Sequence, residues 1–404
     1  MRDIAREQGK RPASRIASID VIRGAIMILM ALDHVRLYLT NASFDPMDLS
    51  RTSVPLFLTR WITHFCAPGF VFLAGAGAYL RGRRGSRRSL AGFLLVRGLW
   101  LILLELTVVR LGWTFNFDYR HYVLLGVLWM LGWSMVALAG LVFLPYPAIA
   151  AFGFLVVFGH NALDRWVPAH YEALQAGSHG WIWQITYLGG TISAGPDGPL
   201  FAVLYSLVPW IGVIALGYAF GRVLTWPEER RRRACLAIGG AGLALFLVLR
   251  GFNLYGNPSP WKSQPSAALT VLSFLNTRKY PASLLFLLMT LAPTILAIPF
   301  AESLRGRAGR FLQVFGRVPL FFYVLHIWVA HAIAAALSAI RYGRVIPWMF
   351  ANHPYMPGPH PDGYGYGLPA VWLVTALVVL LLYPACRAFA ALKAERPGGW
   401  LSFL

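Results

Sequence analysis

Charged residues are scarce in this chain, and acidic residues are the scarcest of them. Asp, Glu, Lys and Arg make up 13% of the 404 residues, with 16 acids against 36 Lys and Arg. No polar stretch is long enough to form a soluble domain of its own. The composition therefore indicates a single membrane domain.

The chain also lacks the sequence signatures of several chemistries. Its three cysteines, Cys66, Cys235 and Cys386, lie in or beside apolar runs, without the spacing of a disulfide framework or a metal site. No Ser-centred nucleophile elbow, P-loop or HExxH motif is present. We therefore expect no bound metal and none of the enzyme types that these motifs mark.

Long apolar runs dominate what is present, since 57% of the residues are hydrophobic. A spanning helix needs about 20 mostly apolar residues, because only a helix satisfies its own backbone hydrogen bonds in hydrocarbon. The sequence predicts an all-α polytopic membrane protein with about ten transmembrane helices in one bundle. The predicted spans are residues 17–40, 54–80, 90–112, 121–143, 146–164, 199–224, 234–250, 281–301, 311–339 and 369–389.

The formal net charge of +20 comes from arginine clusters beside the span ends. Positive-inside bias explains these clusters better than nucleic-acid binding, so we expect no nucleic-acid partner. With ten spans, the clusters and both termini fall on the cytoplasmic side, and all ten histidines fall on the other. We expect a basic cytoplasmic segment over 1–16, one transmembrane domain over 17–390 and a short cytoplasmic tail over 391–404, in the inner membrane of a bacterium.

Polar side chains in the first predicted span point to function, because charged groups in lipid are costly and face a protein interior or a cavity. Asp20 and Arg23 are three residues apart and can pair near the inner end. Arg23 and His34 are eleven residues apart, so they share one helix face about 16 Å apart along its axis. Asp33 is either a neighbour of the His34 imidazole or part of a different face.

Other spans add polar groups that could reach the same region. Arg60 and His64 lie one turn apart in the outer half of the second span, Glu105 lies in the third, and Tyr323 and His326 lie in the ninth. A single intramembrane histidine often only links helices, and Glu105 could simply neutralise an arginine. Aromatic residues in the outer connections either anchor the protein at the interface or stack on sugars.

Three segments, in order, carry a family resemblance. The first span reads SID-x-x-RG with a histidine at the eleventh position after the arginine, the second contains THFCAPGFVFLAG, and a late segment reads FGRVPLFFYVLH. The chain resembles the transmembrane acyltransferases, in particular bacterial relatives of heparan-alpha-glucosaminide N-acetyltransferase. In that enzyme the catalytic histidine precedes a Phe-Pro motif of the second span, whereas the matching stretch here, Ser53 to Pro55, has no histidine.

The resemblance implies acetyl-CoA as acyl donor, histidine at the reaction centre and acylation of an acceptor across the membrane. We expect an acetyl or other short acyl group to pass to a sugar or glycan, with N- or O-transfer open. His34 would act as base or acyl carrier, helped by His64 or Asp33, since imidazole titrates in the useful range. Arg23 and Asp20 are expected at the CoA arm. Arg60, Glu105, Tyr323 and His326 are expected near the acceptor.

Two alternatives remain open at this stage. A proton-coupled exporter or flippase of a small molecule or lipid-linked saccharide would use Asp20, Arg23, Glu105 and the histidines as a relay. We find no internal repeat, which transporters commonly show. A non-catalytic membrane partner protein is the other alternative. The helix faces rich in small residues would also tolerate a homodimer.

Overall fold

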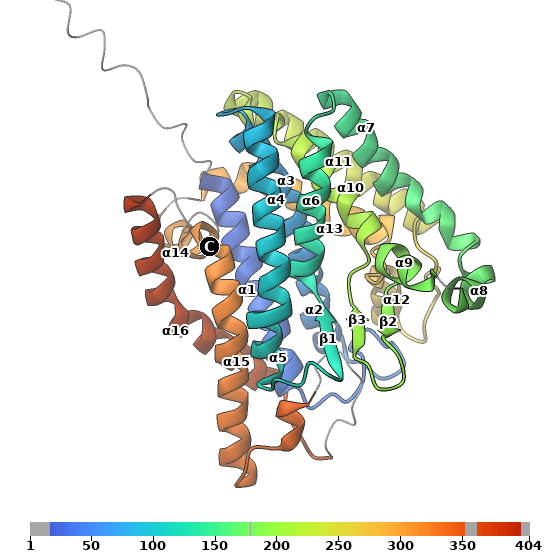
Figure 1. Ribbon diagram of the computed structural model, residues 1–404, viewed down its shortest axis with the longest axis vertical. Coiled ribbons are helices and arrows are strands. Elements are labelled where there is room, and N and C mark those ends of the chain that lie inside the picture. The colour runs from blue at the N-terminus through green and yellow to red at the C-terminus, as the bar shows by residue number, and fades with distance from the viewer. Residues whose placement is uncertain (1–16, 178, 305, 352–361, 397–404) are drawn as a thin grey trace, which may run out of the picture.

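The computed structural model describes residues 17–177, 179–304, 306–351 and 362–396, and it is built mostly of helices (Figure 1). The predicted basic segment 1–16 and part of the predicted tail lie outside the described residues. The helices are α1 (Ala17–Leu39), α2 (Val54–Trp61), α3 (Cys66–Gly82), α4 (Arg87–Leu104), α5 (Arg110–Thr114), α6 (Val127–Leu141), α7 (Tyr146–Gly159), α8 (Tyr171–Ala176), α9 (Gly180–Trp183), α10 (Leu207–Phe220), α11 (Glu228–Gly251), α12 (Ala267–Leu275), α13 (Leu284–Ser303), α14 (Gly306–Arg317), α15 (Pro319–Tyr342) and α16 (Leu368–Glu395).

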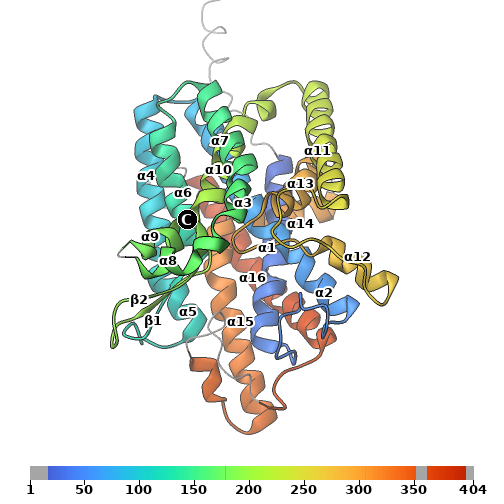
Figure 2. The ribbon, with the colours of Figure 1, turned by 90° about the vertical axis from the view of Figure 1, so that its right-hand side faces the viewer.

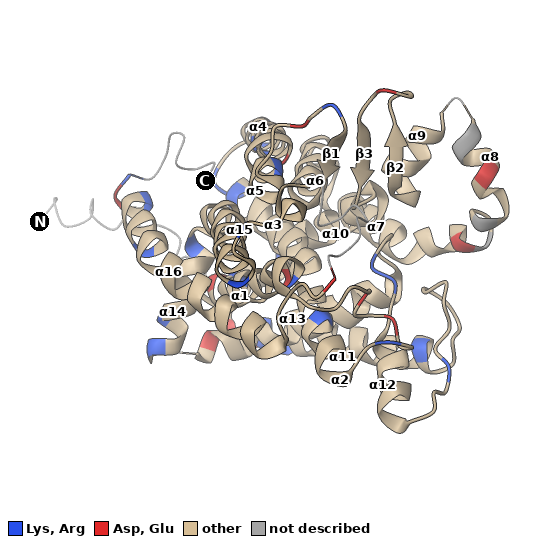
Figure 3. Ribbon diagram, turned by 90° about the horizontal axis from the view of Figure 1, so that it is seen from below, with Lys and Arg blue, Asp and Glu red and all other residues tan. Residues whose placement is uncertain are grey.

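Eight helical segments among the described residues are long and apolar enough to cross a membrane. Two predicted spans fall outside this set for different reasons. Helix α1 carries four charged residues, and α6 is apolar but has only 15 residues. Seen from below, the ribbon is mostly uncharged, with Lys, Arg, Asp and Glu as short separate segments (Figure 3). The predicted all-α polytopic membrane fold is confirmed.

Three predicted spans are built differently from the prediction. The fourth begins with strand β1 (Tyr122–Leu125) and becomes helical only at Val127. The ninth is two helices, α14 and α15, separated at Val318. Pro319 begins α15, because proline lacks an N–H and disfavours helical geometry in the residue before it. The sixth, 199–224, begins with a strand over Leu200–Val203 and becomes helical only at Leu207. The predictions of continuous helices over 121–143, 199–224 and 311–339 were therefore wrong.

A small sheet lies at the end of the bundle opposite the basic loops. Strand β3 (Leu200–Val203) pairs in parallel with β1 and antiparallel with β2 (Gly190–Ser193), so the order is β1-β3-β2. In register, Tyr122 lies opposite Leu200, and Ser193 lies opposite Leu200 on the other edge. The sheet fixes the chain that leads into α6, and α6 lines the candidate site described below.

Helix α1 is the central element of the bundle. It contacts α3, α13, α14, α15 and α16 (Figure 2). Its charged residues Asp20, Asp33 and Arg36 are all buried. Because neighbouring helices enclose α1, its charged side chains face protein and internal cavities, which explains why so polar a helix can lie in this bundle.

Helices α1 and α14 approach each other at glycines. A Cβ on Gly24 would lie 1.9 Å from the carbonyl oxygen of Leu312, and a Cβ on Gly316 would lie 1.8 Å from the carbonyl oxygen of Asp20. Small residues let helix backbones pack closely in membranes. The contact fixes the inner half of α1, which carries Arg23.

Substitution of Gly24 by Val should therefore destabilise the fold. Overpacking against a backbone oxygen is expected to lower the free energy of unfolding by about 3 kcal/mol, measured as the thermal unfolding midpoint in detergent. Gly240→Val in α11 is the matched control, since a Cβ there meets nothing within 4 Å. Equal midpoints for the two variants would contradict the close α1–α14 contact.

Candidate active site

Arg23 and His34 both lie on the central helix α1, but they line different cavities. Arg23 lines a cavity of about 1060 Å³, here called the basic cavity, together with Asp20, Arg81 and Arg231. Arg23 also lines a second cavity of about 280 Å³, here called the apolar cavity. His34 lines a third cavity of about 30 Å³, here called the histidine cavity.

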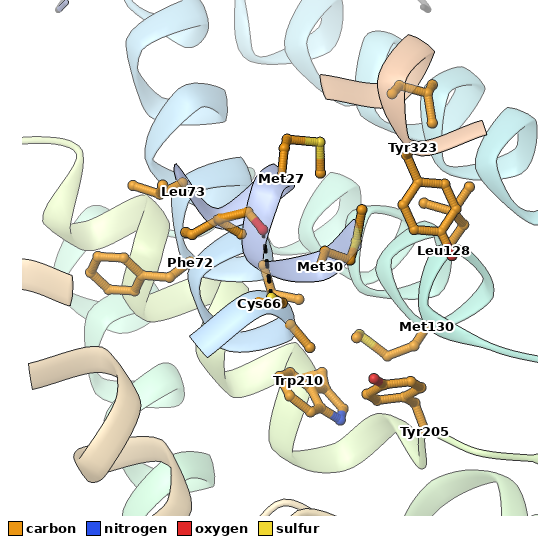
Figure 4. Packing of buried hydrophobic residues seen from close by; sticks show 14 of the residues in the cluster. Met27, Met30, Cys66, Phe72, Leu73, Leu128, Met130, Tyr205, Trp210 and Tyr323 are labelled. Atoms are coloured by element: carbon orange, nitrogen blue, oxygen red, sulfur yellow. Dashed lines mark hydrogen bonds between the residues drawn. The ribbon is translucent and has the colours of Figure 1, made fainter. Parts of the chain in front are cut away.

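The three cavities follow one another from the arginine end toward His34. The basic and apolar cavities share Arg23, Gly77 and Arg81. The apolar and histidine cavities share Phe70, Val127 and Tyr323. Three adjacent cavities therefore lie along α1 between the arginine and the imidazole. Side chains that line them, among them Met27, Met30, Leu128 and Tyr323, are drawn in Figure 4.

His34 is held by a second histidine. Nδ1 of His326 lies 2.9 Å from the carbonyl oxygen of Phe322, to which it can only donate. With both rings neutral, Nε2 of His326 then accepts from Nδ1 of His34 at 2.7 Å. The lone pair of His34 is thereby left on Nε2, and no second hydrogen bond to His34 is found among the described residues.

Aromatic rings complete the surroundings of His34. The edge of Trp113 packs against the imidazole with ring centroids 4.7 Å apart, and the Tyr323 ring lies 6.2 Å away. The His326 ring is nearly parallel to that of His34, at 4.9 Å. These contacts fix the plane of the imidazole. His326, which the sequence analysis assigned to acceptor binding, is the hydrogen-bond partner of His34.

Asp33 forms ion pairs with two arginines. Its carboxylate lies 2.5 Å from Arg60 and 3.1 Å from Arg36. Both pairs are largely buried, so each charge depends on its partner. Asp33 lines the histidine cavity beside His34, but the group that orients His34 is His326. Arg60 joins α2 to α1 through this pair, and it does not line the histidine cavity.

His64 lies apart from the cavity that His34 lines. Its ring packs edge-on against Phe286 of α13, with centroids 5.4 Å apart. The side chain is 1% exposed, and its Nδ1 has no hydrogen-bond partner in the described part of the chain. His64 and His34 therefore do not share the polar cavity that the sequence analysis expected.

Glu105 directly follows α4 in the chain and lines the histidine cavity, and its carboxylate reaches the first turn of α6. Its Oε2 accepts a hydrogen bond from the Leu128 N–H at 2.9 Å, which satisfies a free donor of the first helical turn. Its Oε1 is buried and has no hydrogen-bond partner within the described ranges. A Cβ on Gly126 would lie 2.2 Å from this oxygen, so glycine makes room for it. Glu105 thus caps a helix and forms no ion pair with an arginine of the described residues.

Sequence reasoning missed several residues of the histidine cavity. Lys279 and Tyr280 come from the connection between α12 and α13, Tyr205 precedes α10, and Trp113 lies in α5. One signal was available. Lys279 stands in the segment RKYPAS at the outer end of a span, where positive-inside bias disfavours cations.

Removal of the Asp33 charge tests the buried ion pairs. Asp33→Asn leaves Arg36 and Arg60 without their carboxylate, so the free energy of unfolding should fall by about 3–5 kcal/mol. The control is Glu229→Gln, which breaks an exposed pair with Arg233 and should cost at most about 1 kcal/mol. Thermal unfolding in detergent measures both, and comparable losses would contradict the role given to Asp33.

Comparisons with known proteins identify the family of the chain. A search of curated proteins gave no match for the chain. The family model described as heparan-alpha-glucosaminide N-acetyltransferase, catalytic, matches residues 15–254, which is more than half of the chain. The match includes Arg23, His34, His64 and Glu105, and ends before Lys279, Tyr323 and His326. The resemblance found in the sequence is confirmed, and the chain belongs to the heparan-alpha-glucosaminide N-acetyltransferase catalytic family of membrane acyltransferases.

Proposed function

We propose that this protein transfers an acetyl or other short acyl group from acyl-CoA to a sugar or glycan on the opposite side of the membrane, with His34 as general base. One observation carries the proposal. The free nitrogen of His34 lies at one end of a cavity series whose other end is lined by arginines.

Cations near Arg23 suit the phosphates of CoA. The guanidinium stays charged and matches phosphate geometry, and both cavities at this end are lined by Arg23 and Arg81. Asp20 lines the basic cavity beside them. A pantetheine arm can cover the distance of about 16 Å from Arg23 to His34 along α1. The thioester would then lie at the narrow boundary near Tyr323.

The reaction follows from the position of the His34 lone pair. The acceptor hydroxyl or amine attacks the thioester carbonyl while Nε2 of His34 takes its proton. The tetrahedral intermediate then collapses, the C–S bond breaks, and the proton on His34 passes to the CoA thiolate. His326 acts through His34, because it fixes the tautomer that places the lone pair on Nε2. Attack by Nε2 itself would give an acyl-histidine instead.

The proposed orientation of the protein in the membrane rests on the positions of its positively charged residues. The loop residues Arg83 and Arg84 and the cations of α11 lie at the end of the bundle where the basic cavity opens. Positive-inside bias supports a cytoplasmic position for this end and for both termini, as in a bacterial inner membrane. Acyl-CoA would enter from the cytoplasm, and the acceptor would approach from the other face.

Two histidine substitutions test the chemistry. In an assay of labelled acetyl transfer from acetyl-CoA by the purified protein, we expect His34→Ala to lower kcat by about 10²–10⁴-fold, the usual contribution of a general base. His326→Ala should lower kcat without changing KM for acetyl-CoA, and His326→Gln should restore part of it, since its amide oxygen can accept from His34.

Full activity of His34→Ala would reject the assignment of the base. A labelled protein that accumulates without acceptor and disappears in His34→Ala would assign His34 as acyl carrier. Movement of an acceptor across vesicles without consumption of thioester would favour the exporter or flippase.

Substitution of Arg23 tests the donor end. Arg23→Gln should raise KM for acetyl-CoA about tenfold or more, since a hydrogen bond to a charged group contributes about 1.5–3 kcal/mol. Acetyl-pantetheine, which lacks the nucleotide phosphates, is the matched control substrate, and its KM should not change. Equal effects on both substrates would mean that Arg23 acts through the fold, for example through its 2.8 Å hydrogen bond to Leu73.

A further inference from the structure

Lys279 brings an additional positive charge into the histidine cavity. Lys279 lies in the connection between α12 and α13 and is only 9% exposed to solvent. It lines the histidine cavity together with His34. Its ammonium nitrogen lies 5.1 Å from the centroid of the Tyr280 ring. No carboxylate of the described residues lies within 4.0 Å of that nitrogen. Lys279 is therefore a buried cation without an ion-pair partner in this part of the chain.

The connection that carries Lys279 is held in place by a buried arginine. Arg250 of α11 donates to the carbonyl oxygens of Phe274, Ser273 and Asn276, each at 2.9 Å. These residues end α12 directly before the Lys279 segment. Three charge-assisted hydrogen bonds to one short segment fix its position. The placement of Lys279 is thus built into the fold.

Three cations, Arg36, Arg60 and Lys279, lie near Asp33, while the other carboxylate that lines the cavity, Glu105, is bound to the start of α6. Asp33 faces Arg60 and Arg36, and Lys279 adds a third positive charge near the same carboxylate. Asp45 also acts on Arg36, but it is exposed to solvent. Buried charges are stable only when paired or hydrogen-bonded, so an unpaired excess of positive charge calls for an anion.

The field of these cations acts on a neighbouring hydroxyl. Burial raises the pKa of Tyr280, but Lys279, Arg60 and the hydrogen bond with Tyr205 together bring that pKa below its ordinary value. The Tyr280 hydroxyl lies 3.4 Å from that of Tyr205, and both residues line the cavity. Phenolic hydroxyls can also donate to an anion. Cations and hydroxyl donors therefore converge beside His34.

We propose that the acceptor carries an anionic group, a carboxylate or a phosphate, which Lys279 binds beside the reacting hydroxyl or amine. This inference rests on the proposed acyl transfer at His34. The phosphates of CoA are matched by the arginines at the far end of the cavity series, so they do not account for Lys279. The oxyanion of the tetrahedral intermediate exists only during the reaction, whereas the excess positive charge is permanent.

The size of the histidine cavity sets a condition on binding. At about 30 Å³ it has room for a group of a few atoms and not for a sugar ring. Entry of the acceptor must therefore displace side chains at its wall, such as Tyr280. When Lys279 binds the anionic group of the acceptor, the acceptor's neighbouring hydroxyl or amine would be brought toward Nε2 of His34.

Matched acceptors test the inference in the purified full-length protein. With labelled acetyl-CoA, glucuronate should have a kcat/KM at least about tenfold above that of glucose, and glucosamine 6-phosphate should exceed glucosamine similarly. Lys279→Gln should abolish both preferences, because it lowers kcat/KM for the anionic acceptors more than for the neutral ones, and Lys279→Arg should retain them. Lys262→Gln, at an exposed lysine of the connection between α11 and α12, is the control and should behave as wild type.

Binding without acetyl-CoA separates this inference from the proposed function. Glucuronate and glucosamine 6-phosphate should bind the wild type, measured by calorimetry, and should bind Lys279→Gln at least about tenfold more weakly. Binding without any acyl transfer would keep the anion site and reject the enzyme. Transfer that ignores acceptor charge, or an equal loss with all acceptors in Lys279→Gln, would overturn the anion site and leave the acyltransferase intact.

The stability of the variant gives a second check. Loss of an unpaired buried cation should not destabilise the protein, so the unfolding midpoint of Lys279→Gln without ligand should equal or exceed that of wild type. A clear decrease would indicate that Lys279 is a structural cation, and would overturn the inference.

Discussion

The hydrogen bond between His34 and His326 is the interaction on which the site depends. It joins α1 to α15 across 292 residues of sequence. Because His326 is committed to the Phe322 carbonyl oxygen by its other nitrogen, the proton positions of both neutral rings follow. A free imidazole in a small cavity could adopt either tautomer and several orientations. Here the backbone of α15 determines which nitrogen of α1 faces the cavity, so the chemistry of one helix is set by the geometry of another.

Two buried carboxylates near His34 are stabilised in different ways. Asp33 is paired with Arg36 and Arg60, and its charge ties α1 to α2. Glu105 forms no ion pair within the described part of the chain and accepts from the Leu128 N–H in the first turn of α6, where the helix dipole favours negative charge. One oxygen of Glu105 stays without a hydrogen-bond partner among the described residues. Asp33 is thus fixed in an ion-pair network, whereas Glu105, which also lines the cavity, keeps one buried acceptor oxygen unused among those residues.

The sequence predicted the membrane fold, most span positions and the family. Those features depend on local patterns: apolar length, basic loops and the spacing of Arg23 and His34 along one helix. What could not be predicted was which side chains from other helices meet His34. Helical periodicity tells which face a residue occupies, but it does not tell which neighbour that face contacts. His326, Lys279 and Trp113 therefore required the structure, and His64, one turn from Arg60, turned out to face α13. The sequence did contain a signal for the break between α14 and α15 at Val318, because Pro319 stands within an otherwise apolar run.

The residues shared by the apolar and histidine cavities, Phe70, Val127 and Tyr323, have a consequence for the membrane as a permeability barrier. A protein that reaches from one aqueous side to the other risks leaking protons along the same route. Apolar and aromatic side chains at a constriction exclude water, and a dry constriction does not conduct ions. These three residues would then block the passage of hydrated ions between the two cavities. The thioester arm is narrow and largely uncharged, so it could still pass between them.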